Sequence, residues 1–296
     1  MRWWQGKPAS DPTKDTTALL WKGKQMPNIT PQYATVDGVR IRYADSSSTG
    51  PDAVLLSPWP ESIYAYEQVW EELAAHTRLI AIDLPGYGGS QLSEAHQSPR
   101  AMGGFILKAV EALGLDKPHM VGPDIGTSAV LFAAAQKPDA FRSIVVGSGG
   151  SSVPVNVTGV LKSWVEEPDP GKYRNVDPSQ IVDVALSTIK GFTASAQARN
   201  DYVASYGDGR FAETLKFVQQ YPNQLPQLAE LLPGITVPVR VVAGANDEVV
   251  PADNAHFLVE RIPGSRADFI KDAGHFCWEE KPREYARLVA DWWETH

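Results

Sequence analysis

The chain has 296 residues, of which 43% are hydrophobic and 21% charged, and its formal net charge is −8. This length allows a large buried core, and the acidic balance without a Lys/Arg cluster argues against a nucleic-acid surface. Cys277 is the only cysteine, so an intramolecular disulfide is excluded and a cysteine-based metal site is disfavoured.

The first 32 residues are polar, proline-bearing and aperiodic, and we expect them to form an arm that lies on the body of the protein. They lack the apolar core of a signal peptide. No run of about 18 apolar residues is present, so no segment is expected to span a membrane. These features predict a soluble, cytoplasmic protein with no membrane or nucleic-acid partner.

From residue 33 onward, short apolar segments alternate with amphipathic ones. The Asp37-Gly38 dipeptide between two alternating segments predicts a β-hairpin. The later alternation is typical of a parallel sheet covered by helices on both faces. The expected strands are 33–36, 39–43, 53–56, 78–82, 120–121, 141–146, 237–243 and 267–270, and the expected helices are 64–76, 101–113, 128–136, 254–261 and 283–293.

The alternation is interrupted between residues 150 and 234, where the sequence is helical, irregular and rich in Pro, Asp, Gln and Tyr. We interpret this insertion as a cap over the carboxyl ends of the strands, where α/β sheets bind their ligands. The predicted organisation is therefore an N-terminal arm (1–32), a core domain (33–149 and 235–296) and a helical cap (150–234).

The residues Gly122-Pro123-Asp124-Ile125-Gly126 follow an apolar run and precede an alanine-rich helical stretch. Small residues two before and two after a central side chain permit a sharp strand-to-helix turn that exposes that side chain. A carboxylate at this point can attack carbon and form an ester with the enzyme. The competing interpretation is that Asp124 only caps the following helix, as aspartate commonly does.

Two further polar residues follow the last two predicted strands, Asp247 after 237–243 and His275 after 267–270. A histidine there can activate water, and a neighbouring aspartate can fix its tautomer and stabilise its charged form. Structural roles are the alternative: Asp247 could shape an Asx turn, and His275 could cap the last helix.

Over residues 33–295 the chain resembles the α/β-hydrolase superfamily, in which the nucleophile, acid and histidine occur in the order seen here, 124, 247 and 275. The implied fold is a mostly parallel eight-stranded sheet with helices on both faces and a helical cap. The similarity favours the branch with an aspartate nucleophile, which includes epoxide hydrolases, haloalkane dehalogenases and fluoroacetate dehalogenases. Three motifs carry the similarity. Residues 83–90 (DLPGYGGS) resemble the D-x-x-G-x-G-x-S turn, and residues 272–282 (DAGHFCWEEKP) resemble the catalytic-histidine segment. Residues 57–62 (SPWPES) resemble the H-G-W-P-E-S segment of epoxide hydrolases.

The resemblance implies that the main-chain N–H groups of Trp59 and Ile125 form an oxyanion hole. Ser57-Pro58 replaces the family's His-Gly pair, and Pro58 has no N–H of its own and stiffens this loop. The residue at position 125 is usually Trp in epoxide hydrolases and haloalkane dehalogenases and Arg in fluoroacetate dehalogenases. We expect the side chains of Trp59, Ile125 and Phe276 to contact the substrate.

Epoxide hydrolases that resemble this chain use two cap tyrosines to donate to the epoxide oxygen. Tyr221 falls near the position of the second one, and Trp164 is the best substitute for the first. Tyr173, Tyr202 and Tyr206 are the remaining tyrosines of the cap, and packing is the simpler explanation for them.

The sequence therefore predicts an epoxide hydrolase that acts on a small apolar substrate through an ester on Asp124, with no metal or organic cofactor; assembly as a homodimer is compatible with it. A dehalogenase with the same triad is the first alternative, although Ile125 lacks a side-chain donor for a halide. A serine esterase is disfavoured because no G-x-S-x-G motif occurs. A non-hydrolytic binding protein or cyclisation catalyst on this scaffold is a further alternative.

Overall fold

The computed structural model describes residues 29–296. Residues 1–28 of the predicted N-terminal arm lie outside the described range. Eight strands form one mixed sheet in the order β1-β2-β4-β3-β5-β6-β7-β8. The strands β1 and β2 form the predicted hairpin, β2 is antiparallel to β4, and all later pairs are parallel. The strands are β1 (Pro31–Val36), β2 (Val39–Asp45), β3 (Asp52–Leu56), β4 (Arg78–Ile82), β5 (His119–Pro123), β6 (Ile144–Gly147), β7 (Val239–Gly244) and β8 (Arg266–Ile270).

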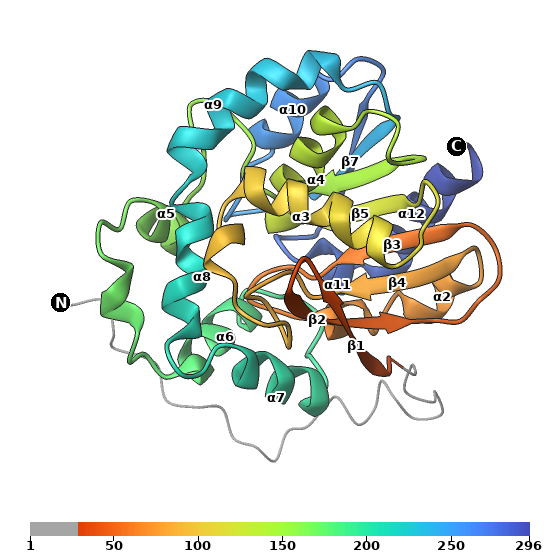
Figure 1. The fold of residues 1–296 in the computed structure, drawn as a ribbon. Helices are drawn as coiled ribbons and strands as arrows, with labels where there is room; N and C mark the ends of the chain where they lie inside the picture. The colour runs from red at the N-terminus through yellow and green to blue at the C-terminus, as the bar shows by residue number, and fades with distance from the viewer. Residues whose placement is uncertain (1–28) are drawn as a thin grey trace.

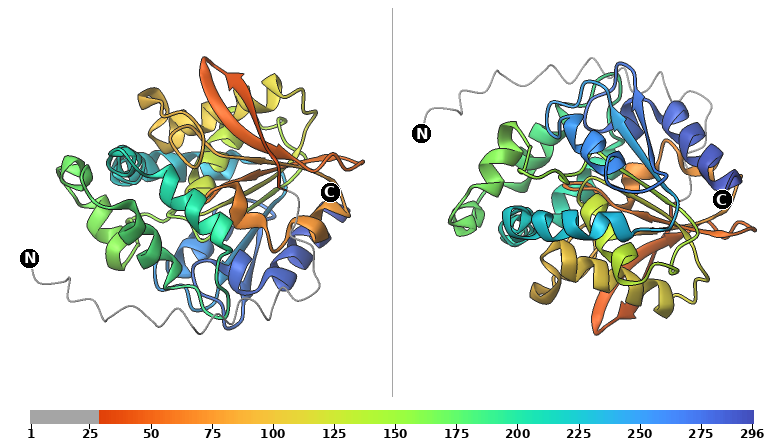
Figure 2. Two further views of the ribbon diagram at one scale, coloured as in Figure 1. Left: turned by 90° about the horizontal axis from the view of Figure 1, so that it is seen from below. Right: turned by 90° about the horizontal axis from the view of Figure 1, so that it is seen from above.

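Helices cover both faces of the sheet, as the sequence predicts (Figures 1 and 2). The helices α3 and α4 pack against each other, α2 contacts α12, and α10 contacts β7 and β8. The central strands are buried along their whole length because they are covered on both sides. The helices of this layer are α2 (Trp70–Ala74), α3 (Pro99–Ala112), α4 (Ile125–Gln136), α10 (Asp253–Val259), α11 (Cys277–Glu280) and α12 (Pro282–Glu294).

The main local difference from the sequence prediction is the helix expected over 64–76. The chain instead forms a short 3-10 helix (Ile63–Tyr66), a break and then α2. All four residues of the 3-10 helix are buried, so this segment has no solvent face of the kind that an amphipathic helix presents. The Tyr66 hydroxyl also donates to the Leu56 carbonyl at 2.5 Å, which ties the segment to the end of β3.

Five α-helices lie between β6 and β7, in the segment predicted to form the cap (Figure 1). They are α5 (Gly159–Val165), α6 (Pro178–Leu186), α7 (Ala196–Ser205), α8 (Arg210–Val218) and α9 (Tyr221–Leu231). Among residues 29–296, no helix is both long and apolar enough to cross a bilayer.

Two arginines, Arg42 and Arg210, form hydrogen bonds between the cap and the core. Arg42 on β2 contacts Asp83 at 2.5 Å and holds Asp201 on α7 through two bonds of 2.6 and 2.7 Å. Arg210 at the start of α8 donates to three carbonyl oxygens of the turn that follows β4, those of Gly86, Gly88 and Ser90. The cap is therefore positioned by buried charge-assisted bonds as well as by apolar packing.

Candidate active site

Asp124 lies at the predicted elbow between β5 and α4. Its backbone has φ 51° and ψ −121°, a left-handed conformation that is rare for a residue other than glycine and marks local strain. A side chain at Gly122 would meet Val130 Cγ2 at 2.8 Å, so this tight crossing of strand and helix requires glycine there. The Asp124 carboxylate makes no capping hydrogen bond to α4, so the alternative role of a helix cap has no support.

The Asp124 carboxylate lies between two groups of the core. One oxygen, Oδ2, accepts a hydrogen bond of 2.7 Å from the Trp59 N–H, and the other, Oδ1, is 3.7 Å from His275 Nε2. The Ile125 N–H opens α4, and the first N–H groups of a helix have no partner within that helix. The two expected oxyanion donors thus come from the loop that contains Trp59 and from the first residue of α4, Ile125.

His275 and Asp247 are paired in the structure. The His275 Nδ1 lies 3.0 Å from Asp247 Oδ2, and Asp247 Oδ1 accepts bonds of 2.8 Å from the N–H groups of Val249 and Val250. Burial alone would lower the pKa of His275, but Asp247 and Asp124 outweigh burial and raise it to about 10. The resting imidazole is therefore cationic, held between two carboxylates.

A narrow cavity of ≈ 60 Å³ opens above Asp124 and His275. Its walls are mostly apolar and come from the core loops on one side and from α5 and α6 of the cap on the other. Val160 and Val184 of the cap line it while remaining 43% and 40% exposed, which places apolar side chains where the cavity meets solvent. The lining residues are Trp59, Pro60, Asp124, Val160, Leu161, Trp164, Val184, Ala185, Thr188, Val249, His275 and Phe276.

Two indoles from different parts of the chain meet in this cavity. The ring of Trp59, from the core, lies 5.0 Å from that of Trp164, from α5, and both contact Phe211 of α8. The Trp59 Nε1 is buried and has no hydrogen-bond partner among the described residues. A buried N–H donor without a partner is costly, so Trp59 is a candidate for binding a substrate atom.

Tyr221, the other predicted cap donor, does not line the cavity. Its ring packs against Gly150, where an added Cβ would approach Tyr221 Cε2 to 2.6 Å, and against Phe217 of α8. Burial raises the pKa of the Tyr221 phenol above its usual value, and the Asp124 charge acts in the same direction. The structure therefore brings Trp164 together with the triad and leaves Tyr221 behind the glycine turn that follows β6.

The other residues singled out in the sequence also divide into those that line the cavity and those that do not. Phe276 lines the cavity, and its ring lies 4.9 Å from the ring of His275. The Ile125 side chain is fully buried and is not among the lining residues. Tyr206 donates through its hydroxyl to the Glu61 carbonyl at 3.1 Å, which is a packing role.

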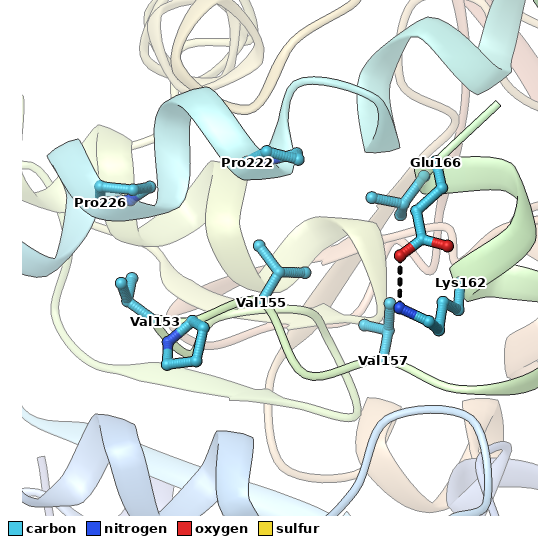
Figure 3. Close-up of a pocket in the computed structure, with 9 residues that line it drawn as sticks. Val153, Val155, Val157, Lys162, Glu166, Pro222 and Pro226 are labelled. Atoms are coloured by element: carbon cyan, nitrogen blue, oxygen red, sulfur yellow. Dashed lines mark hydrogen bonds and ion pairs between the residues drawn. The ribbon is translucent and has the colours of Figure 1, made fainter. Parts of the chain in front are cut away.

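Helix α5 separates this cavity from a second hollow, a groove of ≈ 320 Å³ between α5, α9 and residues 153–157 (Figure 3). Pro222 and Pro226 of α9 form one side, and an ion pair between Lys162 and Glu166 borders the other. Neither Asp124 nor His275 lines this groove. The two faces of α5 thus have different surroundings: Val160, Leu161 and Trp164 face the cavity, while Lys162, Val165 and Glu166 line the groove.

The cap residues that shape the cavity from α6 and the turn after it, Val184, Ala185 and Thr188, were missed from the sequence. They belong to no motif, and the apolar spacing of a helix does not indicate which cavity its side chains will line. Among the described residues, no group of His, Cys, Asp or Glu side chains could hold a metal ion.

Comparison with known proteins agrees with this architecture. The family model described as the alpha/beta hydrolase fold matches residues 54–282. The chain therefore belongs to the α/β-hydrolase family, and at this level it is a hydrolase.

Named relatives share this fold at low identity. The 2-hydroxy-6-oxononadienedioate/2-hydroxy-6-oxononatrienedioate hydrolase 2 of Pseudomonas putida is 29% identical over 229 residues, which cover 74% of this chain and 78% of that protein. Cfl2 from Burkholderia cenocepacia superposes with a TM-score of 0.79 at 22% identity, covering 91% of this chain and 98% of Cfl2. The epoxide hydrolase CorEH gives a TM-score of 0.75 at 22% identity, covering 90% of this chain and 99% of CorEH. The two structural likenesses show the fold alone.

Proposed function

We propose that this protein is a hydrolase that forms an ester between Asp124 and its substrate, and that the substrate is a small apolar epoxide converted to a vicinal diol. The observation that carries the proposal is the position of the Asp124 carboxylate, at a strained elbow between the Trp59 N–H and His275. A carboxylate that caps no helix and lines an apolar cavity is suited to attack carbon.

In the first step, an oxygen of the Asp124 carboxylate attacks one ring carbon, the bond from that carbon to the ring oxygen breaks, and the oxygen leaves as an alkoxide. Of the two donors expected from the cap, only Trp164 lines the cavity, so we assign it the hydrogen bond to this oxygen. An indole donates a hydrogen bond but does not release its proton readily, so the alkoxide takes its proton from the cationic His275, directly or through a water molecule.

The second step uses the charge arrangement around His275. Ester formation neutralises Asp124, which is one of the two carboxylates that raise the pKa of His275. The imidazolium therefore gives its proton to the alkoxide more easily, and the neutral imidazole can then deprotonate a water molecule. The resulting hydroxide attacks the ester carbonyl, and the N–H groups of Trp59 and Ile125 stabilise the oxyanion. Cleavage of the ester bond releases the diol and returns Asp124 as a carboxylate that carries one oxygen from water.

A single turnover in ¹⁸O-labelled water tests this route. The label should enter Asp124 and be absent from the diol released first. Label in that first diol would show direct attack of water on the epoxide and would contradict the ester. Asp124→Asn is the matched control, because it keeps the shape of the side chain and removes the nucleophile. If Asp124→Asn keeps its affinity for the ligand and its turnover does not differ from that of the wild type in any assay, the result would instead favour a binding protein.

A second candidate function, carbon–halogen hydrolysis through the same ester, is favoured by the two indoles. A halide leaving group needs donors that replace its hydration in a dry site, and Trp59 and Trp164 meet in this cavity while no tyrosine lines it. Halide release from small haloalkanes and haloacids measures this activity directly. A Trp59→Phe variant, which keeps the ring and loses the unpartnered N–H, should reduce dehalogenation more than epoxide opening.

A further inference from the structure

Two buried carboxyl groups beside the site take no part in the proposed reaction. Glu61 follows Trp59 by two residues, and Glu279 lies in α11, four residues after His275; their exposed fractions are 0% and 2%. The Trp278 Nε1 donates to Glu61 Oε2 at 3.2 Å. The other Glu61 oxygen, Oε1, and Glu279 Oε2 are buried without a hydrogen-bond donor among the described residues.

The two carboxyl groups are brought together because α11 packs against the 3-10 helix Ile63–Tyr66 and Trp278 of α11 bonds to Glu61. One hydrogen bond links them, and it lowers the pKa of Glu61 and raises that of Glu279, so the Glu279 carboxyl is the donor. Within residues 29–296 neither carboxyl makes an ion pair with Lys, Arg or His. Two ionised carboxylates repel strongly in a dry site, whereas one proton between them satisfies an oxygen on each side. Burial raises the pKa of Glu61 to about 7, and burial together with Glu61 raises that of Glu279 well above its usual value.

The surroundings of the pair also disfavour a second negative charge. Glu67 and Glu280 add negative charge near Glu279, and Asp124 acts in the same direction on Glu61, while cationic His275 opposes it. The Tyr202 hydroxyl of α7 is buried in the same region and has no hydrogen-bond partner within residues 29–296. The titratable groups that face the pair are Asp124 at the elbow, His275 in the loop after β8, Glu280 of α11, Tyr66 of the 3-10 helix, Glu67 directly after it, and Tyr202 on α7.

We propose that one proton shared by Glu61 and Glu279 ties the Trp59 loop to helix α11, and that this tie positions the Trp59 N–H and His275 on the two sides of the Asp124 carboxylate. The positioning half of this inference rests on the proposed function, and the shared proton does not. Loss of the proton leaves two carboxylates in contact, and their repulsion separates the loop from α11. Glu61 and Glu279 are thus positioning residues, since neither lines the cavity.

The pH dependence of Glu279→Gln tests the positioning role. The amide of this variant donates to Glu61 without a proton that titrates. In the wild type, kcat should fall about tenfold per pH unit once the pair loses its proton on the alkaline side. Glu279→Gln should keep kcat near the wild-type value at neutral pH and lose this alkaline fall.

Glu67→Gln is the matched control. Glu67 is a buried carboxyl whose pKa burial raises to about 7, but its partner is the Ser195 hydroxyl at 3.1 Å. This variant should retain the alkaline fall of the wild type. An unchanged alkaline fall in Glu279→Gln, or its loss in Glu67→Gln alone, would overturn the assignment of this fall to the Glu61–Glu279 pair.

The shared proton itself is measured by infrared spectroscopy without any substrate. The spectrum of the wild type minus that of Glu279→Gln at pH 8, above the pKa of about 7 of Glu61, should contain the carbonyl band of one protonated carboxylic acid, and this band should disappear as the pH rises further. Absence of the band at pH 8 would overturn the proposal. This result does not depend on turnover, so it separates failure of the shared proton from failure of the ester mechanism.

Discussion

Raising the pH from 6.5 to 8 should destabilise the wild-type protein more than a His275→Gln variant. The pKa of His275 rises from 6.5 to about 10 on folding. A group whose pKa is raised in the folded state stabilises the fold fully below its unfolded pKa, and this stability is lost as the pH rises toward the folded value. One pKa unit corresponds to about 1.4 kcal/mol, so the loss between pH 6.5 and 8 is at most about 2 kcal/mol.

Urea denaturation of both proteins at pH 6.5, 7.25 and 8 measures this difference in the free energy of unfolding. The other groups with raised pKa values, such as Glu61, Glu67 and Glu279, are present in both proteins and largely cancel in the comparison. The free energy of the wild type should fall relative to that of the variant at each step. A difference that stays constant over this range would refute the cationic His275 between Asp124 and Asp247.

Three further substitutions test the site and its support. Trp164→Phe keeps the ring packing against Trp59 and removes the proposed donor. Steady-state kinetics should show a fall in kcat of about 10²-fold, the low end of the loss seen when one transition-state donor is removed. Asp201→Ala leaves part of the Arg42 charge unpaired in a largely buried site, and thermal or urea unfolding should show a loss of about 3 kcal/mol, the low end for a broken buried pair. Gly122→Ala places a methyl group 2.8 Å from Val130 Cγ2, and circular dichroism melting should show destabilisation with displacement of the elbow.

The elements that surround the triad could be predicted from the sequence because their signals are local. Small residues around Asp124 specify the elbow, and the apolar strands before Asp247 and His275 place both at the same edge of the sheet. The fold class follows from the alternation of strands and helices, and the eight-stranded sheet follows from the resemblance to the α/β-hydrolase superfamily. The strand predicted over 141–146 begins later, at Ile144, because a short apolar run does not mark its own first residue.

What the sequence could not predict depends on contacts between distant segments. The position of Tyr221 depends on Gly150, which precedes it by most of the cap and lets the phenol ring pack closely. Glu61 and Glu279 are 218 residues apart, and no sequence pattern indicates that two carboxyl groups will meet in a dry site. Which cap side chains line a cavity is decided by the packing of several helices at once, and not by the spacing within one of them.

The measurement that tests the central claim most directly is the intact mass of His275→Gln after incubation with a substrate that the wild type consumes. The variant keeps the nucleophile and loses the base, so the ester should accumulate. The account predicts a mass increase equal to one epoxide, or to one alkyl group for a haloalkane, located by peptide mapping on Asp124. An unmodified protein after incubation with every consumed substrate, or an adduct on another residue, would contradict it.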